Sequence, residues 1–128
     1  MDVLSETVLE SGGVLTIEGE FKTFDSDVNL AAPVADCFCL FDGDAMFVII
    51  AYLLPSTSDV GKIQPYFRFL ESDPTNAEKN DASELGANYI IKGHSARLNL
   101  NYVIGDENIS GYRGADTDSL TFGIQIQL

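Results

Sequence analysis

The sequence lacks a long apolar run and has few basic residues. Its longest apolar run, Ala45 to Leu54, has ten residues, well short of the roughly 18 that a membrane-spanning helix needs. Only seven lysines and arginines stand against 20 aspartates and glutamates, which gives a net charge of −13. Because a nucleic acid would be repelled by this charge, we expect no nucleic-acid partner. A helical membrane protein is excluded as well.

The N-terminus also lacks a secretory signal. Glu6 and Glu10 stand where a signal peptide would carry basic residues, so if the protein is exported, the signal has been removed or lies outside this sequence. The two cysteines, Cys37 and Cys39, are separated by one residue. This spacing strains a disulfide, and two thiols alone do not make a metal site. Their role is left open.

No set of residues indicates catalysis, so we expect neither an enzyme nor a cofactor. The single histidine, His94, follows Gly93 in a predicted tight turn, where a turn residue is expected and not a general base. Glu18 and Glu20 lie on one strand face, about 7 Å apart, as glycosidase carboxylates do. Two acids on a hydrated surface explain this pair more simply.

Paired aspartates in the predicted loops suggest one modest metal hypothesis. In three places, one aspartate is followed two positions later by another. Such pairs can supply oxygen ligands for Ca²⁺ or Mg²⁺. Loops that are merely solvated explain them more simply, and we predict no metal site. The pairs are Asp25/Asp27, Asp42/Asp44 and Asp116/Asp118.

The dominant signal is alternation of apolar and polar residues, which places the two kinds on opposite faces of a strand. It is clearest at the C-terminus, where Leu120, Phe122 and Ile124 alternate with Thr121 and Gly123. Segment 45–54 is apolar on both faces but β-rich in composition. Pro65 lacks a ladder donor and is expected at a strand end, an irregularity or an edge. The pattern predicts six strands, at 14–24, 45–54, 62–71, 83–92, 95–104 and 118–128, with 3–9 as an optional seventh.

The length of the strands and of their connections favours a membrane barrel. Each predicted strand has about ten residues, the length of a tilted strand that crosses a bilayer. Short connections (11–13, 55–61 and 92–95) alternate with long ones (25–44, 72–82 and 105–117). Outer-membrane barrels show this asymmetry between their two rims. We therefore predict an all-β fold, an antiparallel up-and-down meander that forms part of a transmembrane β-barrel.

The charges divide between the predicted loops and the polar strand faces. Thirteen acids fall in the three long loops or at their borders, whereas the polar faces are mixed and slightly positive. Such faces suit a hydrated lumen, and the apolar, aromatic-rich faces suit lipid. We predict that the polar faces line a pore through Glu18, Glu20, Lys22, Lys62, Gln64, Arg68, Lys92, Arg97, Asn99, Asn101, Gln125 and Gln127.

Several segments resemble the C-terminal end of the phosphate-selective porin O and P family. The matching stretches are GKIQPYFRF, ELGANYIIKGHSARLNLNYVIGD and LTFGIQIQL, preceded by YLLPSTSDVGKIQPY and SGGVLTIEGEF. Together they cover most of the chain, and segment 25–44 has no counterpart. The sequence departs from the usual pattern at its end, where Leu128 stands in the place of the phenylalanine that helps barrel insertion.

The resemblance implies a porin in the outer membrane of a Gram-negative bacterium, commonly a homotrimer, through which small solutes diffuse. Family members have roughly sixteen strands around an aqueous channel, so this chain would be a C-terminal part that needs the remaining strands of the barrel and the lipid bilayer. Anions are candidate solutes, but phosphate selectivity needs converging cations that the sequence does not establish. Two alternatives stay open: a soluble β-barrel or sandwich that binds a small apolar ligand, with Leu98, Leu100, Phe122 and Ile124 facing inward, and an inactive piece that never folds.

Overall fold

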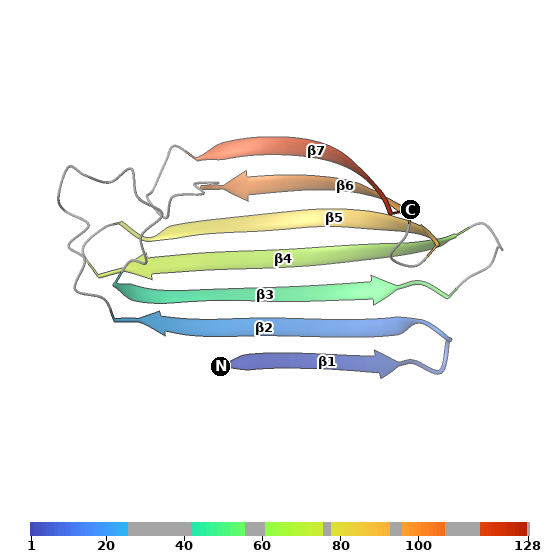
Figure 1. Ribbon diagram of the computed structural model, residues 1–128, viewed down its shortest axis with the longest axis horizontal. Coiled ribbons are helices and arrows are strands. Elements are labelled where there is room, and N and C mark those ends of the chain that lie inside the picture. Colours follow the sequence, from blue (N-terminus) through green and yellow to red (C-terminus); the bar gives the residue numbers. More distant parts are fainter. Residues whose placement is uncertain (26–41, 56–60, 76–77, 93–95, 107–115, 128) are drawn as a thin grey trace.

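The described part of the chain is a single antiparallel sheet (Figure 1). The computed structural model describes residues 1–25, 42–55, 61–75, 78–92, 96–106 and 116–127. Each strand pairs with its neighbour in the chain, as the meander prediction required. Since the strand number is odd, the first and last strands run in the same direction. The strands are β1 (Asp2–Val8), β2 (Val14–Phe24), β3 (Gly43–Leu53), β4 (Lys62–Pro74), β5 (Asn80–Lys92), β6 (Ala96–Gly105) and β7 (Thr117–Ile126).

Among the described residues no helix has the length and apolar character needed to cross a membrane. The optional seventh strand is present as β1, and the turn that follows it is closed by hydrogen bonds from Leu9 N to Gly13 O and from Gly12 N to Leu9 O, both 2.8 Å. Gly12 has a φ of +82° there, a conformation that only glycine adopts without strain. The predicted turn at 11–13 is therefore confirmed.

The predicted long connection at 72–82 is wrong. β4 continues to Pro74, which pairs with Gly43 of β3. β5 begins at Asn80, which pairs with Ser72 of β4. The connection is thus the short segment 75–79. Lys79 Nζ lies 2.7 Å from Glu71 Oε1, and this hydrogen bond raises the pKa of the Lys79 ammonium. Connection length therefore does not alternate as regularly as the sequence suggested.

Some acids that the sequence analysis assigned to loops lie in strands. Of the thirteen acids assigned to loops or their borders, five lie inside strands. They gather at the end of the sheet where β2, β4 and β6 finish, here called the acidic end; the other is the opposite end. The five are Asp44, Glu71, Asp73, Asp81 and Asp118.

Pro65 lies inside β4 and faces Ala87 of β5. The β3–β4 register ends at the pair Ala51 and Tyr66, and Tyr66 directly follows Pro65 in the chain. Ile63 O accepts a hydrogen bond from Leu54 N, so by alternation an N–H at position 65 would also point toward β3. The missing donor therefore coincides with the place where the β3–β4 ladder is interrupted.

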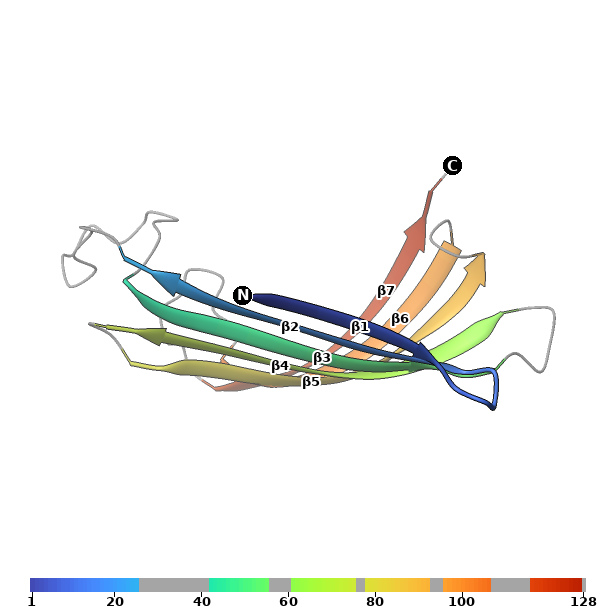
Figure 2. The same ribbon diagram turned by 90° about the horizontal axis from the view of Figure 1, so that it is seen from below.

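The two faces of the sheet differ in shape and chemistry. The sheet is curved and open, with β6 and β7 rising from the rest (Figure 2). One face carries an unbroken apolar row in which each residue faces the next across the strands. Every side chain in this row is exposed, from 39% to 72%. The row is Ile17, Ile50, Phe67, Leu85, Tyr102 and Leu120.

The core is thin. Ala51, Ala82 and Val103 form the buried hydrophobic core of the described part of the chain, and all three belong to the other, polar face by strand alternation. Within the described residues, no second layer covers either face of the sheet. The sheet is thus held mainly by its hydrogen-bonded ladders and by contacts between neighbouring side chains on each face.

Candidate functional site

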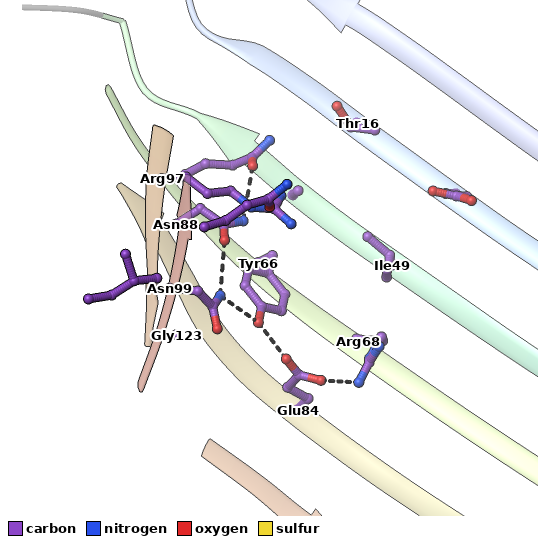
Figure 3. A pocket seen from close by; sticks show the side chains of 14 residues that line it. Thr16, Ile49, Tyr66, Arg68, Glu84, Asn88, Arg97, Asn99 and Gly123 are labelled. Carbon is purple, nitrogen blue, oxygen red and sulfur yellow. Dashed lines mark hydrogen bonds and ion pairs between the residues drawn. The ribbon is translucent and has the colours of Figure 1, made fainter. Parts of the chain in front are cut away.

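The polar side chains line a hollow of about 550 Å³ on the inside of the curved sheet (Figure 3). Residues from β2 to β7 contribute to its wall, so the polar face is the concave one. Six of the twelve predicted pore-lining residues border the hollow. They are Glu18, Gln64, Arg68, Arg97, Asn99 and Gln125.

A buried carboxylate lies at the centre of this concave face. Glu84 is 3% exposed and faces Arg68 directly in the β4–β5 register. One carboxylate oxygen pairs with the Arg68 guanidinium, and the other accepts hydrogen bonds from the Tyr66 hydroxyl and, at 2.9 Å, from Asn101 Nδ2. Because a buried charge is costly unless it is paired, these three donors explain how Glu84 is accommodated.

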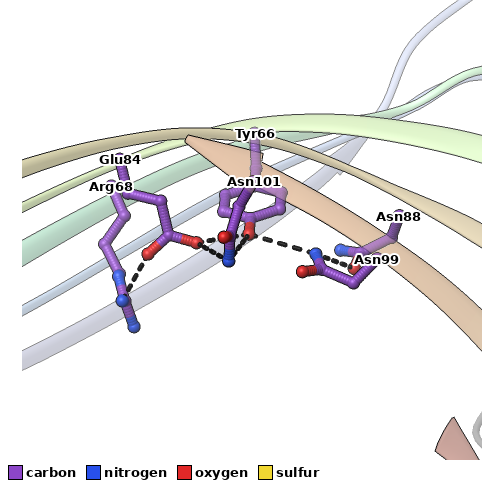
Figure 4. Close-up of polar contacts among 6 residues, drawn as sticks. All are labelled: Tyr66, Arg68, Glu84, Asn88, Asn99 and Asn101. Carbon is purple, nitrogen blue, oxygen red and sulfur yellow. Dashed lines mark hydrogen bonds and ion pairs between the residues drawn. The ribbon is translucent and has the colours of Figure 1, made fainter. Parts of the chain in front are cut away.

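Amide side chains extend this network across the sheet (Figure 4). Asn99 Nδ2 donates to the Tyr66 hydroxyl at 3.1 Å and to Asn88 Oδ1 at 2.9 Å. Asn88 Nδ2 in turn donates to Gln64 Oε1 at 3.2 Å. In Figure 4 the labelled side chains project from the curved strands on one side of the sheet. The network therefore ties β4, β5 and β6 together on the concave face.

Gly86 makes room for the central tyrosine. Tyr66 faces Gly86 in the β4–β5 register, and a Cβ atom at Gly86 would overlap the tyrosine ring. The hydroxyl end of the ring therefore occupies the space over the glycine, and the hydroxyl bonds to Glu84 and Asn99. The absence of a side chain at this position is what allows the network to form.

Two ion pairs join charged residues of the concave face. Arg68 is neutralised by Glu84, and Lys22 Nζ lies 2.6 Å from Glu20 Oε1. In the described part of the chain, Lys62 and Arg97 have no ion-pair partner. The face is also less positive than predicted, because β1 adds acids to it. The carboxylates are Asp2, Glu6, Glu18, Glu20 and Glu84, against Lys22, Lys62, Arg68 and Arg97.

The other predicted pore-lining residues fall into three groups. Glu20, Lys22, Lys62 and Asn101 share the concave face by register but lie outside the hollow. Gln127 is exposed and follows the end of β7. Lys92 ends β5 beside an irregularity in the β5–β6 register, and its side chain lies outside the described part of the structure.

Sequence reasoning missed part of this surface. Tyr66, Glu84 and Asn88 hold the network together, yet they are not among the predicted pore-lining residues. Alternation with apolar neighbours places all three on polar rows, but it did not single them out as pore-lining residues. Ile49 and Ala51 also border the hollow, because β3, apolar on both faces, turns one of its apolar rows inward. The concave face therefore contains an apolar stripe beside its amides and charges.

The described residues contain no group of three or more histidines, cysteines, aspartates or glutamates arranged to hold a metal ion. Asp27, the partner of Asp25 in the metal hypothesis, lies outside the described residues, as do His94, Cys37 and Cys39. On the concave face, Glu18 stands apart from Glu20, which pairs with Lys22. The contacts of this surface among the described residues are hydrogen bonds and ion pairs.

Comparison with family models, curated proteins and solved structures gives no match for this chain. The resemblance to the phosphate-selective porins thus rests on the sequence segments quoted above. What the fold adds is independent of that resemblance: an open, curved sheet with a polar concave face and an exposed apolar convex face.

Proposed function

We propose that this chain forms part of the wall of a water-filled β-barrel channel through which small solutes diffuse passively. In this proposal the convex face contacts the hydrocarbon of a lipid bilayer, and the concave face is wetted by the lumen. The remaining wall is supplied by further strands. The resemblance to porins extends the proposal to the outer membrane of a Gram-negative bacterium and to a homotrimer.

The observation that carries the proposal is the distribution of exposed apolar side chains. A water-soluble sheet buries its apolar face against a second layer, but here a row of six apolar side chains, from Ile17 on β2 to Leu120 on β7, is exposed. An apolar patch of this extent marks an interaction surface. The opposite face holds charges and amides that suit water. This combination is typical of a membrane barrel wall.

The soluble alternative is less well supported. It requires Leu98, Leu100, Phe122 and Ile124 to converge in a closed interior. They lie on the convex side of an open sheet instead, and Leu100, Phe122 and Ile124 are 51% to 63% exposed. Phosphate selectivity is not part of the proposal, because Arg68 is neutralised by Glu84 and, among the described side chains of the concave face, only Lys62 and Arg97 are cations without an ion-pair partner.

Two neighbouring residues of β7 provide a direct test. Gln125 borders the hollow, whereas Ile126 lies on the convex face and is 69% exposed. We would reconstitute the complete protein in planar bilayers, with Cys37 and Cys39 replaced by serine, and introduce Gln125→Cys or Ile126→Cys. A bulky, charged, water-soluble thiol reagent is expected to reduce the single-channel current of Gln125→Cys and to leave that of Ile126→Cys unchanged.

A lipid-phase quencher gives the complementary readout. A fluorophore at position 126 should be quenched from within the bilayer, and the same fluorophore at position 125 should not. The proposal fails if the protein is a monodisperse, water-soluble species without detergent and adds no conductance to the bilayer.

A further inference from the structure

The hollow on the concave face is electrically balanced. Four charged side chains of the described residues border it, Glu18 and Glu84 against Arg68 and Arg97, so their formal charges cancel. Arg68 and Glu84 already pair with each other. An anion site needs several converging cationic donors, and among the described side chains of the hollow only Arg97 is left for that role. Glu18 is likewise the only carboxylate left for a cation.

The two remaining charges are too far apart to hold a small zwitterion between them. Glu18 shares a register row with Arg68, and Arg97 shares a row with Lys62. Arg68 and Lys62 are six residues apart on β4, which corresponds to about 20 Å along the strand. An amino acid in the hollow therefore contacts one of these charges at a time.

Between these charges the hollow presents a row of side-chain amides. Gln64, Asn88 and Asn99 are in register across β4, β5 and β6. Asn99 Nδ2 donates to Asn88 Oδ1, and Asn88 Nδ2 donates to Gln64 Oε1, so the hydrogen bonds run in one direction. Gln64 Nε2 is therefore left as a donor at one end of the row, and Asn99 Oδ1 is left as an acceptor at the other, neither with a partner among the described residues. Two strand spacings, about 10 Å, separate the two residues.

This mixture of donors and acceptors indicates the chemistry of the ligand. An ionised carboxylate only accepts hydrogen bonds and an ammonium group only donates them, whereas a hydroxyl group does both. Gln125, which also borders the hollow, adds a further amide with a donor and an acceptor. The row is therefore complementary to a solute that carries several hydroxyl groups and no net charge.

An apolar strip and an open space lie beside the amides (Figure 3). Ile49 and Ala51 of β3 border the hollow, and Ala51 is in register with Tyr66. Gly123 is in register with Asn99, and a Cβ atom there would meet only Asn99 Cβ, at 3.8 Å. A sugar carries hydroxyl groups around its ring and C–H groups on the ring faces, so amides next to apolar side chains match both. The volume of about 550 Å³ is typical of small-molecule pockets.

We infer that the hollow is a binding subsite for uncharged polyhydroxylated solutes, namely mono- and disaccharides, on the wall of the channel. Gln64, Asn99 and Gln125 bind hydroxyl groups, and Ile49 and Ala51 contact the C–H groups. The inference rests on the proposed function and adds a solute class to it. Passage of a sugar then becomes saturable, whereas simple diffusion is not.

Block of the channel current by a sugar measures this binding. The complete protein is reconstituted in planar bilayers, and sucrose is added on both sides at constant salt. A polyethylene glycol of similar hydrodynamic size is the comparison solute, because its chain offers ether oxygens and almost no hydroxyl groups. We expect the single-channel current to fall along a saturating curve with sucrose and only in proportion to concentration with the polymer.

Two variants locate the binding in the hollow. Gln64→Met keeps the length of the side chain and removes its amide, so it should raise the half-blocking sucrose concentration about three- to tenfold, the effect of losing one hydrogen bond. Gly123→Val places a side chain in the space beside Asn99 and should also weaken the block, while the current in salt alone persists. Gln127→Met is the matched control, because Gln127 follows the end of β7 and lies outside the hollow; it should leave the half-blocking concentration unchanged.

A proportional fall of the current with sucrose, or a saturating block that neither Gln64→Met nor Gly123→Val changes, would overturn the subsite and leave the channel intact. Saturating block by inorganic phosphate or by glycine at the same ionic strength, without block by sucrose, would overturn the solute class. Absence of any conductance would overturn the proposed function and the subsite with it.

Discussion

Tyr66 and Gly86 occupy the middle of the concave face, and each requires the other. Gly86→Ala should lower the free energy of unfolding by about 1–3 kcal/mol, because the added methyl group overlaps the tyrosine ring and overpacking has costs of this size. Gly123→Ala is the matched control, since a Cβ there meets only Asn99 Cβ at 3.8 Å. Denaturant unfolding of the reconstituted protein should show no loss for Gly123→Ala. Equal losses for both variants would contradict the steric role of Tyr66.

Glu84 and Glu18 are two inward carboxylates of one register row with different surroundings. Glu84→Gln should destabilise the protein by about 1–3 kcal/mol, because it leaves the Arg68 guanidinium without its anion. Glu18→Gln should change stability by less than about 0.5 kcal/mol, since no described residue pairs with Glu18.

The ion selectivity of the channel should respond differently to these two variants. Each variant removes one negative charge from the concave face. Glu18→Gln should shift the reversal potential in a salt gradient toward anion preference directly, because no described residue neutralises Glu18. Glu84→Gln should act through the released Arg68, so combining it with Arg68→Gln should cancel its shift. If the reversal potential were still shifted in that double variant, release of Arg68 from Glu84 would not be the cause.

The residues of this network show what a single sequence can and cannot reveal. Alternation places Tyr66, Arg68 and Glu84 on polar rows, and the structure keeps them on one face. Which of them meet depends on the cross-strand register, and a period of two along each strand does not specify it. The burial of Glu84 and the room left by Gly86 follow from that register, so neither was predicted.

The strands differ in how firmly each is held. Among the described strands of this chain, β1 pairs only with β2, through seven register positions, and all its residues are exposed, whereas β4 and β5 share eleven positions and the network. Exposed ladders with few side-chain contacts open most readily. Hydrogen exchange followed by mass spectrometry should therefore deuterate β1 first and β4–β5 last. Slower exchange in β1 than in β4 would contradict this order.

At this scale the sequence predicted most of the architecture. β2 begins and ends where alternation begins and ends, because period two is a local property of a strand. The margins of β4 and β5 were missed, since the stretch from Ser72 to Asp81 is rich in residues that disfavour strands. Its two ends are strand because they pair across the sheet, Pro74 with Gly43 and Asn80 with Ser72.

For the molecule as a whole, the decisive property is the medium that each face meets. Phe122 on the convex face and Thr121 on the concave face are neighbours in β7. Phe122→Lys should cost about 2–4 kcal/mol of stability in lipid vesicles, because a lysine deep in hydrocarbon is unfavourable, whereas Thr121→Lys should cost close to zero. Folding titrations in vesicles would measure both. If Phe122→Lys cost no more stability than Thr121→Lys, both faces of the sheet would be in contact with water.

The odd number of strands constrains how the curved sheet closes. β1 and β7 point the same way, so a ring of identical copies, all inserted in one orientation, would meet along parallel seams between β7 of one copy and β1 of the next. An odd complement of additional strands placed between these edges restores up-and-down order at every seam. Strand parity alone thus favours a wall completed by unlike strands over a cylinder assembled from repeats of this sheet.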